Sequence, residues 1–143
     1  MEKWDLYDEN RQMLSKTIEK GQKHDAYTLR VHFCLFNSFG KMLIQQRASS
    51  KKHWPNVWDL TLSGSSQVGE TSKEAIAREV KEEFGLDIDF STERACFTFN
   101  YANCFDDFYI IERFLYNFLQ FSNAIISKRF AIFHVTSRML AFA

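Results

Sequence analysis

The segment from residue 64 to residue 86 constrains the fold more than any other, because it carries start and stop signals for a helix. It reads GSSQVGETSKEAIAREVKEEFGL. Thr71 and Glu74 have the spacing of a capping box, in which Thr71 is the N-cap and the Glu74 side chain reaches back to it. Gly85 is a natural residue to end the helix, because glycine readily adopts the left-handed conformation. The segment predicts a helix from about Ser72 to Phe84.

The predicted helix has an apolar stripe and an acidic face. The apolar stripe repeats every four residues and consists of Ile76, Val80 and Phe84. Glu79, Glu82 and Glu83 lie three and four residues apart and share one face. These like charges repel one another, and the negative end of the helix dipole disfavours them further. A bound cation would offset both penalties, and oxygen ligands without nearby Cys or His favour Mg²⁺, or alternatively Mn²⁺, over zinc.

An acidic helix face taken alone is most often a solvated surface, so the residues beside it decide the interpretation. Glu70 and Arg78 can pair across the junction between the loop and the helix. Such a pair would fix the loop that carries Gly64. The flanking residues therefore favour a built site over a solvated face.

The same positions resemble the Nudix box, which marks hydrolases of nucleoside diphosphates linked to another moiety. The match runs position for position from Gly64 to Leu86. The resemblance implies catalysis and metal binding for Glu79, Glu82 and Glu83, a further metal-binding carbonyl at Gly64, and structural roles for Glu70, Arg78 and Gly85. It also implies water as the nucleophile and a small-molecule diphosphate as the substrate.

The preceding stretch, FNSFGKMLIQQRASSKKHWPNVWDLTLSG, resembles isopentenyl-diphosphate isomerases and their Nudix hydrolase relatives. The isomerases carry Cys-Gly-His where this chain has Ser63-Gly64-Ser65. Serine cannot replace the thiol as a proton donor near neutral pH, because its pKa is far higher. The substitution and the intact box favour a hydrolase. An isomerase-like enzyme and a non-catalytic Nudix-like binding module are the alternatives.

A basic segment after the expected strand at residues 42–46 is a candidate for substrate binding. Arg47, Lys51 and Lys52 place three cations within six residues, where they could receive a diphosphate. In the isomerase-like relatives, similar basic residues contact the substrate phosphates. Arg47 and Lys51 are therefore candidate ligands of the phosphates, and Trp54 is a candidate for stacking on a base or covering the cleft. An ordinary solvated loop is the alternative.

Composition bounds the class of protein. A chain of 143 residues with 45% hydrophobic residues suits a single domain spanning residues 1–143. The net charge of +0 argues against general nucleic-acid binding. No apolar run is long enough to span a membrane, and the first residues lack a signal-peptide pattern. The odd number of cysteines without metal spacing fits free thiols, so we expect a cytoplasmic protein.

Alternating and β-rich segments predict strands at residues 4–8, 29–36, 42–46, 58–62, 96–101 and 108–116. Strands combined with one strong helix indicate an α+β fold. The resemblance implies the Nudix fold, an α/β/α sandwich in which a mixed sheet has helices on both sides.

The C-terminal part, residues 117–143, departs from the family pattern. No Asp or Glu follows Glu112, whereas Nudix relatives usually carry acids here and end in a longer amphipathic helix. Residues 129–135 could form a strand, and Thr136 could cap a short helix. A frameshift, a truncation and a natural divergence each fit this composition. The apolar end favours self-association, so a homodimer is an expected partner state. The downstream acids that could complete a site are Asp106, Asp107 and Glu112.

Overall fold

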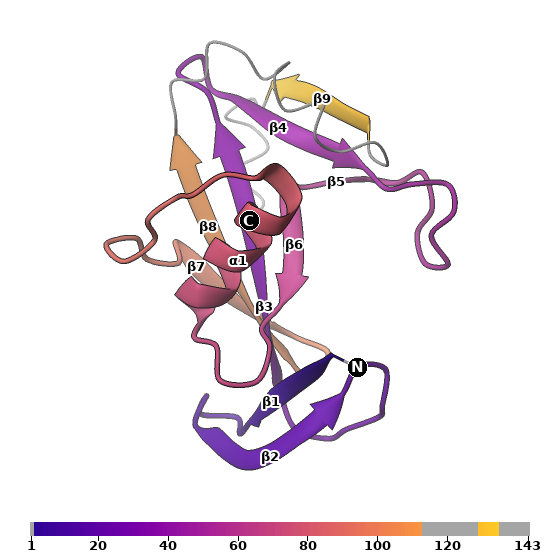
Figure 1. Cartoon of the computed structure of the whole chain (residues 1–143), viewed down its shortest axis with the longest axis vertical. Helices are drawn as coiled ribbons and strands as arrows, with labels where there is room; N and C mark the ends of the chain where they lie inside the picture. The colour runs from indigo at the N-terminus through magenta and orange to yellow at the C-terminus, as the bar shows by residue number, and fades with distance from the viewer. Residues whose placement is uncertain (1, 113–128, 135–143) are drawn as a thin grey trace. The chain divides into compact units, whose positions relative to one another are not determined.

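The computed structural model describes residues 2–112 and, as backbone, residues 129–134. Its elements are β1 (Lys3–Tyr7), β2 (Met13–Glu19), β3 (Thr28–Phe36), β4 (Lys41–Gln46), β5 (Trp58–Asp59), β6 (Leu62–Ser65), α1 (Ser72–Phe84), β7 (Phe97–Tyr101), β8 (Cys104–Glu112) and β9 (Arg129–His134) (Figure 1). The chain forms two compact units. The first contains residues up to 32 and residues 63–109, and the second contains residues 33–62 and those from 110 onward.

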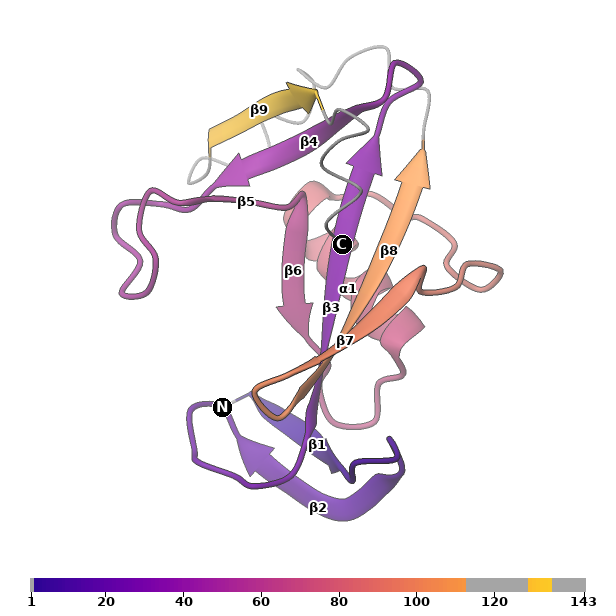
Figure 2. The same ribbon diagram turned by 180° about the vertical axis from the view of Figure 1, so that it is seen from behind.

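The first unit contains two antiparallel hairpins and the helix. β1 pairs with β2 from Lys3 opposite Glu19, and β7 pairs with β8 from Phe97 opposite Phe108. Ala102 and Asn103 have φ of 47° and 58° at the β7–β8 turn, as a tight two-residue hairpin requires. β8 is the neighbour of β3 in the strand order, and β6 also pairs with β3. The helix α1 lies over one face of β6 and β8 (Figures 1 and 2).

The core of the first unit follows the apolar patterns of the sequence. Helix α1 buries Ala75, Ile76, Val80 and Phe84. The strands of this unit contribute further buried apolar side chains, among them Leu29, Val31, Phe105 and Tyr109. The predicted apolar stripe of the helix is therefore confirmed, and it fixes which helix face is left for polar chemistry.

The second unit is organised around β4. One run of β4 pairs with β9, from Lys41 opposite His134 to Gln46 opposite Arg129. The end of β4 also pairs with β5, and its start pairs with the end of β3 through Phe36 opposite Met42. The buried Thr61 hydroxyl accepts a hydrogen bond from the Leu35 N–H at 2.9 Å and donates one to the Leu43 carbonyl at 2.6 Å.

Most of the predicted elements are confirmed, and the exceptions have physical causes. The helix has the predicted bounds, and the strand predicted at residues 129–135 is β9. The predicted strand at residues 58–62 is wrong as one element, because β5 ends at Asp59 and β6 begins at Leu62. β8 begins at Cys104 rather than at residue 108, so Cys104 lies on a strand and is buried.

β2 was not predicted, because its sequence, MLSKTIE, is largely polar and its residues are mostly exposed. Trp58, on the short strand β5, is 46% exposed. The helix that Thr136 would cap, and the part of the predicted strand beyond Glu112, lie outside the described residues. No helix in the described part of the chain is long and apolar enough to cross a membrane.

Candidate functional site

The acidic helix is fixed at both ends by the predicted capping residues. The Thr71 side chain accepts a hydrogen bond from the Glu74 N–H, and the Glu74 carboxylate accepts one from the Thr71 N–H at 2.8 Å. Gly85 ends the helix with φ of 68° and donates its N–H to the Lys81 carbonyl at 2.9 Å. The positions of the glutamates along α1 are therefore set locally.

The loop before α1 is held by β1. The Gly69 N–H donates to the Asp5 carboxylate at 2.7 Å, and the Val68 N–H donates to the Lys3 carbonyl at 3.1 Å. The Gln67 N–H donates to the Glu70 carboxylate at 2.8 Å. The role of Asp5 in positioning the loop was not predicted from the sequence. The signal was a carboxylate inside the apolar alternation of β1, and this side chain is buried.

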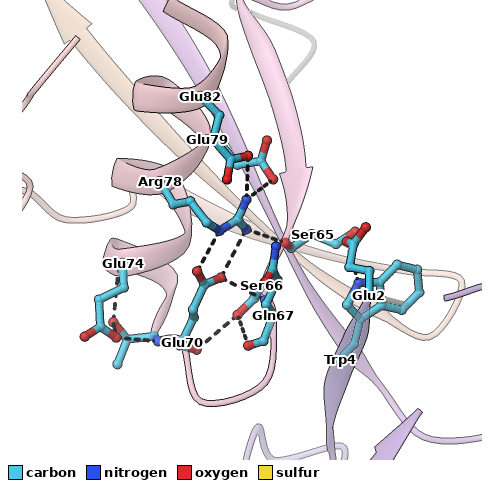
Figure 3. A network of polar contacts seen from close by, with 11 residues as sticks. Glu2, Trp4, Ser65, Ser66, Gln67, Glu70, Glu74, Arg78, Glu79 and Glu82 are labelled. Carbon is cyan, nitrogen blue, oxygen red and sulfur yellow. Dashed lines mark hydrogen bonds and ion pairs between the residues drawn. The ribbon is translucent and has the colours of Figure 1, made fainter. Parts of the chain in front are cut away.

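Arg78 is the centre of the polar network (Figure 3). Its Nε and Nη2 donate to the two oxygens of Glu70 at 2.6 and 3.1 Å, so the predicted pair is present and bidentate. Nη2 also donates to the Ser65 carbonyl at 3.0 Å. Nη1 donates to Glu79 at 2.8 Å and to Glu82 at 3.2 Å. These bonds occupy all five donors of the guanidinium. The hydrogen bonds that Arg78 donates to Glu70 are the largest cause of the raised Arg78 pKa.

Glu79 is largely enclosed, with a side chain that is 13% exposed. Burial raises its pKa, the nearby Glu82 and Glu83 raise it further, and the contact with Arg78 partly offsets the rise. Gly64 leaves room for this carboxyl group, because a Cβ at position 64 would overlap the end of the Glu79 side chain. Position 64 therefore requires glycine for a steric reason that holds whether or not its carbonyl binds a metal.

The carboxylates have the chemistry of a divalent-cation site, but they are not gathered into one in this structure. Oε2 of Glu79 and Oε1 of Glu82 form no hydrogen bond within the described residues. Glu82 turns toward Arg78 and is 57% exposed, so its side chain can rotate at little cost. Glu83 lies half-buried one turn beyond Glu79. In the part of the chain that the structure describes, no three His, Cys, Asp or Glu side chains are arranged around a metal position.

The downstream acids Asp106 and Asp107 have other partners. Asp107 accepts hydrogen bonds from Arg11 at 2.8 Å, Ser72 at 2.5 Å and Thr98 at 2.6 Å. Ser72 is seven residues before Glu79, which is about 10 Å along a helix axis, so Asp107 stands apart from the glutamates. The contact between Arg11 and Asp107 was not predicted from the sequence.

Asp106 contacts His32 and Arg30 on the neighbouring strand. The distance to His32 Nε2 is 2.7 Å and the distance to Arg30 Nη1 is 3.6 Å. Glu112 is exposed and belongs to the second unit. None of the three downstream acids is placed by these contacts next to Glu79.

The predicted substrate-binding residues lie in the second unit, on the loop between β4 and β5. Arg47 and Val57 close this loop with a hydrogen bond of 3.0 Å between N–H and carbonyl. The Arg47 Nε donates to the His53 carbonyl at 3.3 Å. Trp54 is 75% exposed and has φ of 54°. Within the described residues, neither Arg47 nor Lys51 forms an ion pair with a carboxylate, so both charges are available to an anion.

Comparison with known proteins places these features in a family. Residues 26–125 match the NUDIX domain model. Over 115 residues, the chain is 47% identical to a Nudix hydrolase of Listeria innocua, a match that covers 79% of this chain and 68% of the relative. A Nudix hydrolase of Listeria monocytogenes is 45% identical with the same coverage. The isopentenyl-diphosphate Delta-isomerase of Escherichia coli is 42% identical, but over 50% of this chain and 41% of the isomerase.

Solved structures agree with the sequence comparisons. A crystal structure of a protein from Deinococcus radiodurans is similar with a TM-score of 0.73 and 26% identity, covering 98% of this chain and 90% of that one. The solution structure of a hypothetical Nudix protein from the same organism has a TM-score of 0.52 and 27% identity, covering 98% and 82%. These likenesses confirm the predicted α+β fold.

Proposed function

This chain belongs to the Nudix hydrolase family, and from that premise we propose that it uses Mg²⁺, or alternatively Mn²⁺, to cleave a diphosphate bond by attack of water. The substrate is a nucleoside diphosphate linked to another moiety, or a related organic diphosphate. The observation that carries the proposal is the Glu79 carboxylate, which is enclosed over Gly64 beside two further glutamates and has a raised pKa.

The proposed metal-binding residues are Glu79, Glu82 and Glu83 with the carbonyl of Gly64. Oxygen donors alone favour a hard divalent cation. Such a cation neutralises phosphate charge and lowers the pKa of bound water. Arg78 bonds to Glu79 and Glu82 and so keeps both carboxylates on the side of α1 that faces Ser65.

One of the same three glutamates is proposed as the general base. A general base works best when its pKa lies near the working pH. Burial raises the pKa of Glu79 toward that range, which supports a proton-accepting role for this residue. The three glutamates are therefore proposed as catalytic as well as metal-binding residues.

Arg47, Lys51 and Trp54 are proposed to bind the substrate. Two cations without carboxylate partners in the described residues can hold a diphosphate, and the exposed Trp54 ring can stack on a flat group. The three cysteines form no disulfide, which supports the proposal that the protein works in a reducing cytoplasm.

The test is a screen for phosphate release over nucleoside triphosphates, sugar nucleotides, dinucleotides and isoprenoid diphosphates, with Mg²⁺ or with excess EDTA. We expect turnover only with the cation, rising toward alkaline pH as the base and the nucleophile lose protons. Glu82→Gln and Glu83→Gln should each lower the rate by about tenfold to a thousandfold.

The matched control is Lys81→Gln, which changes an exposed charge on the same helix and should leave the rate unchanged. Full activity in EDTA would contradict the metal-dependent mechanism. A normal rate in one of the glutamine variants would remove that glutamate from the site.

A further inference from the structure

The proposed chemistry leaves one built surface of the first unit unused, at the outer edge of β7. β7 stands at the end of the strand order and pairs with β8 on one side. No strand of the described residues pairs with its other side (Figure 2). All five residues of β7 are exposed. Along an open edge, every second residue directs its N–H and C=O outward, where another strand can bind them.

The side chains of β7 divide by face. Phe97, Phe99 and Tyr101 alternate along one face and are 37%, 51% and 75% exposed. We call these three residues the aromatic edge. Thr98, on the opposite face, donates its hydroxyl hydrogen to Asp107 at 2.6 Å. The polar face of β7 is thus bonded within the unit, while the aromatic edge is the face that exposes apolar area.

The aromatic edge is held in place by neighbouring rings. Phe108 of β8 stacks on Phe97 at 4.5 Å between ring centroids and meets Phe99 edge to face at 6.1 Å. On its other side Phe108 stacks on His32 at 4.3 Å. Rings fixed in this way lose little side-chain entropy when a partner covers them, and aromatic residues are enriched at protein interfaces.

We propose that the aromatic edge is a homodimer interface, in which β7 pairs antiparallel with β7 of a second copy around a two-fold axis at Phe99. The pairing sets Phe99 opposite Phe99, Phe97 opposite Tyr101 and Thr98 opposite Asn100. Both faces of the new ladder then match, with aromatic rings continuing across one face and amide and hydroxyl groups across the other.

Charge favours a second copy as the occupant. β7 carries no charged residue, and the whole chain has a net charge of +0, so two copies meet without repulsion. An acidic or basic partner would find no complementary charge on this strand. β7 also lacks the lysine, proline or bulge with which edge strands usually prevent pairing. The residues of β7 are other than the C-terminal residues for which self-association was predicted from the sequence.

The test uses sedimentation velocity on the full chain over a concentration series. The wild type should form a dimer, and Phe99→Lys should weaken the dimer at least about tenfold, because two lysines would oppose each other at the two-fold axis. Phe99→Glu should have the same effect. An equal mixture of the two variants should restore the dimer, since lysine then faces glutamate. Met13→Lys changes an equally exposed apolar residue on β2 and should leave the dimer intact.

A second variant keeps the proposal testable if these substitutions impair folding. Phe99→Cys in a Cys96→Ser background should form a disulfide between copies under mild oxidation, because facing residues of antiparallel strands lie within disulfide reach. Met13→Cys in the same background should not. A monomeric wild type, an undiminished Phe99→Lys dimer, a mixture that stays monomeric, or absence of the 99–99 disulfide would each overturn the proposal. Dimers that survive every change at position 99 would locate the interface elsewhere.

Discussion

Arg78 brings together side chains that would otherwise repel one another. Glu79 and Glu82 both accept hydrogen bonds from its Nη1, while Glu70 takes the opposite side of the guanidinium. The guanidinium therefore supplies positive charge to the acidic face whether or not a metal is bound. Lysine could not replace it, since a lysine has three donors on one nitrogen and no planar fork.

We expect Arg78→Ala to lower both activity and stability. The side chain is 19% exposed, and its removal leaves enclosed carboxylates unpaired, at a cost of about 2 kcal/mol. For a chain of this size, each kcal/mol of lost stability lowers the Tm by roughly 4 °C. Differential scanning calorimetry and a rate assay on the same samples measure both effects. Arg78→Lys should recover only part of each loss. A variant with the wild-type Tm and rate would show that the network has no role in the site.

Gly64 provides a second residue-scale prediction, because its requirement is steric. Gly64→Ala should cost about 1–3 kcal/mol, the usual range for adding a methyl group to filled space. The same substitution in a Glu79→Ala background should cost little, since the overlapping side chain is then absent. Urea unfolding of the four proteins in this cycle measures the coupling. If Gly64→Ala lowered the free energy of unfolding equally in both backgrounds, the Glu79 side chain would not be the reason that position 64 requires glycine.

At the scale of elements, Asp107 ties α1 to two strands and a turn. Its carboxylate, 2% exposed, bonds to Ser72 at the start of α1, to Thr98 on β7 and to Arg11 after β1. Tyr109 on β8 donates to the Ser72 hydroxyl at 2.9 Å. α1 is therefore anchored at its N-terminus by polar contacts and along its length by apolar packing.

Asp107→Ala should destabilise the fold by on the order of 3 kcal/mol, as breaking a buried ion pair does. Burial raises the pKa of Asp107, but the bonds from Arg11, Ser72 and Thr98 outweigh burial and leave it below its usual value. Asp107 then stabilises the fold fully at pH values above about 3.9, the pKa of Asp in an unfolded chain. This stabilisation is lost as the pH falls through the lower pKa of Asp107 in the folded protein. The stability difference between wild type and variant, from urea unfolding, should shrink below about pH 4. Asp87→Ala, at an exposed ion pair, is the control.

At the scale of the whole molecule, the chain shares its family with hydrolases over most of its length and with isomerases over half. The single domain expected for residues 1–143 stays a prediction. Two compact units need not be two domains, because β3 runs through both of them. Because the relatives belong to two enzyme classes, the reaction has to be inferred from particular residues of the site and not from the family alone.

We expect no conversion of isopentenyl diphosphate to its allylic isomer. Ser63 stands where the isomerases carry a thiol, and a serine hydroxyl does not supply a proton near neutral pH. Nuclear magnetic resonance of the substrate after incubation with protein and Mg²⁺ measures the conversion directly. Ser63→Cys is the informative companion, because it tests whether the thiol alone suffices. Isomerisation by the wild type that disappears in Ser63→Ala would overturn the assignment as a hydrolase.

The sequence by itself determined the helix, its caps and the identity of the acidic face. These features depend on residues within one or two turns of each other, so their spacing along the chain is also their spacing in space. The pair of Glu70 and Arg78 belongs to this group, because the loop between them is short and the helix fixes one end.

Only the tertiary structure decided which distant residues support the site. Asp5 holds the loop from 64 residues away, and Arg11 meets Asp107 from 96 residues away. The steric need for Gly64 appears only when β6 lies against α1 and Glu79 fills the space over it. Whether Cys104 or Trp58 is buried likewise depends on what packs against each strand. Local patterns encode helix and strand, whereas burial and long-range pairing result from the free energy of the packed chain as a whole.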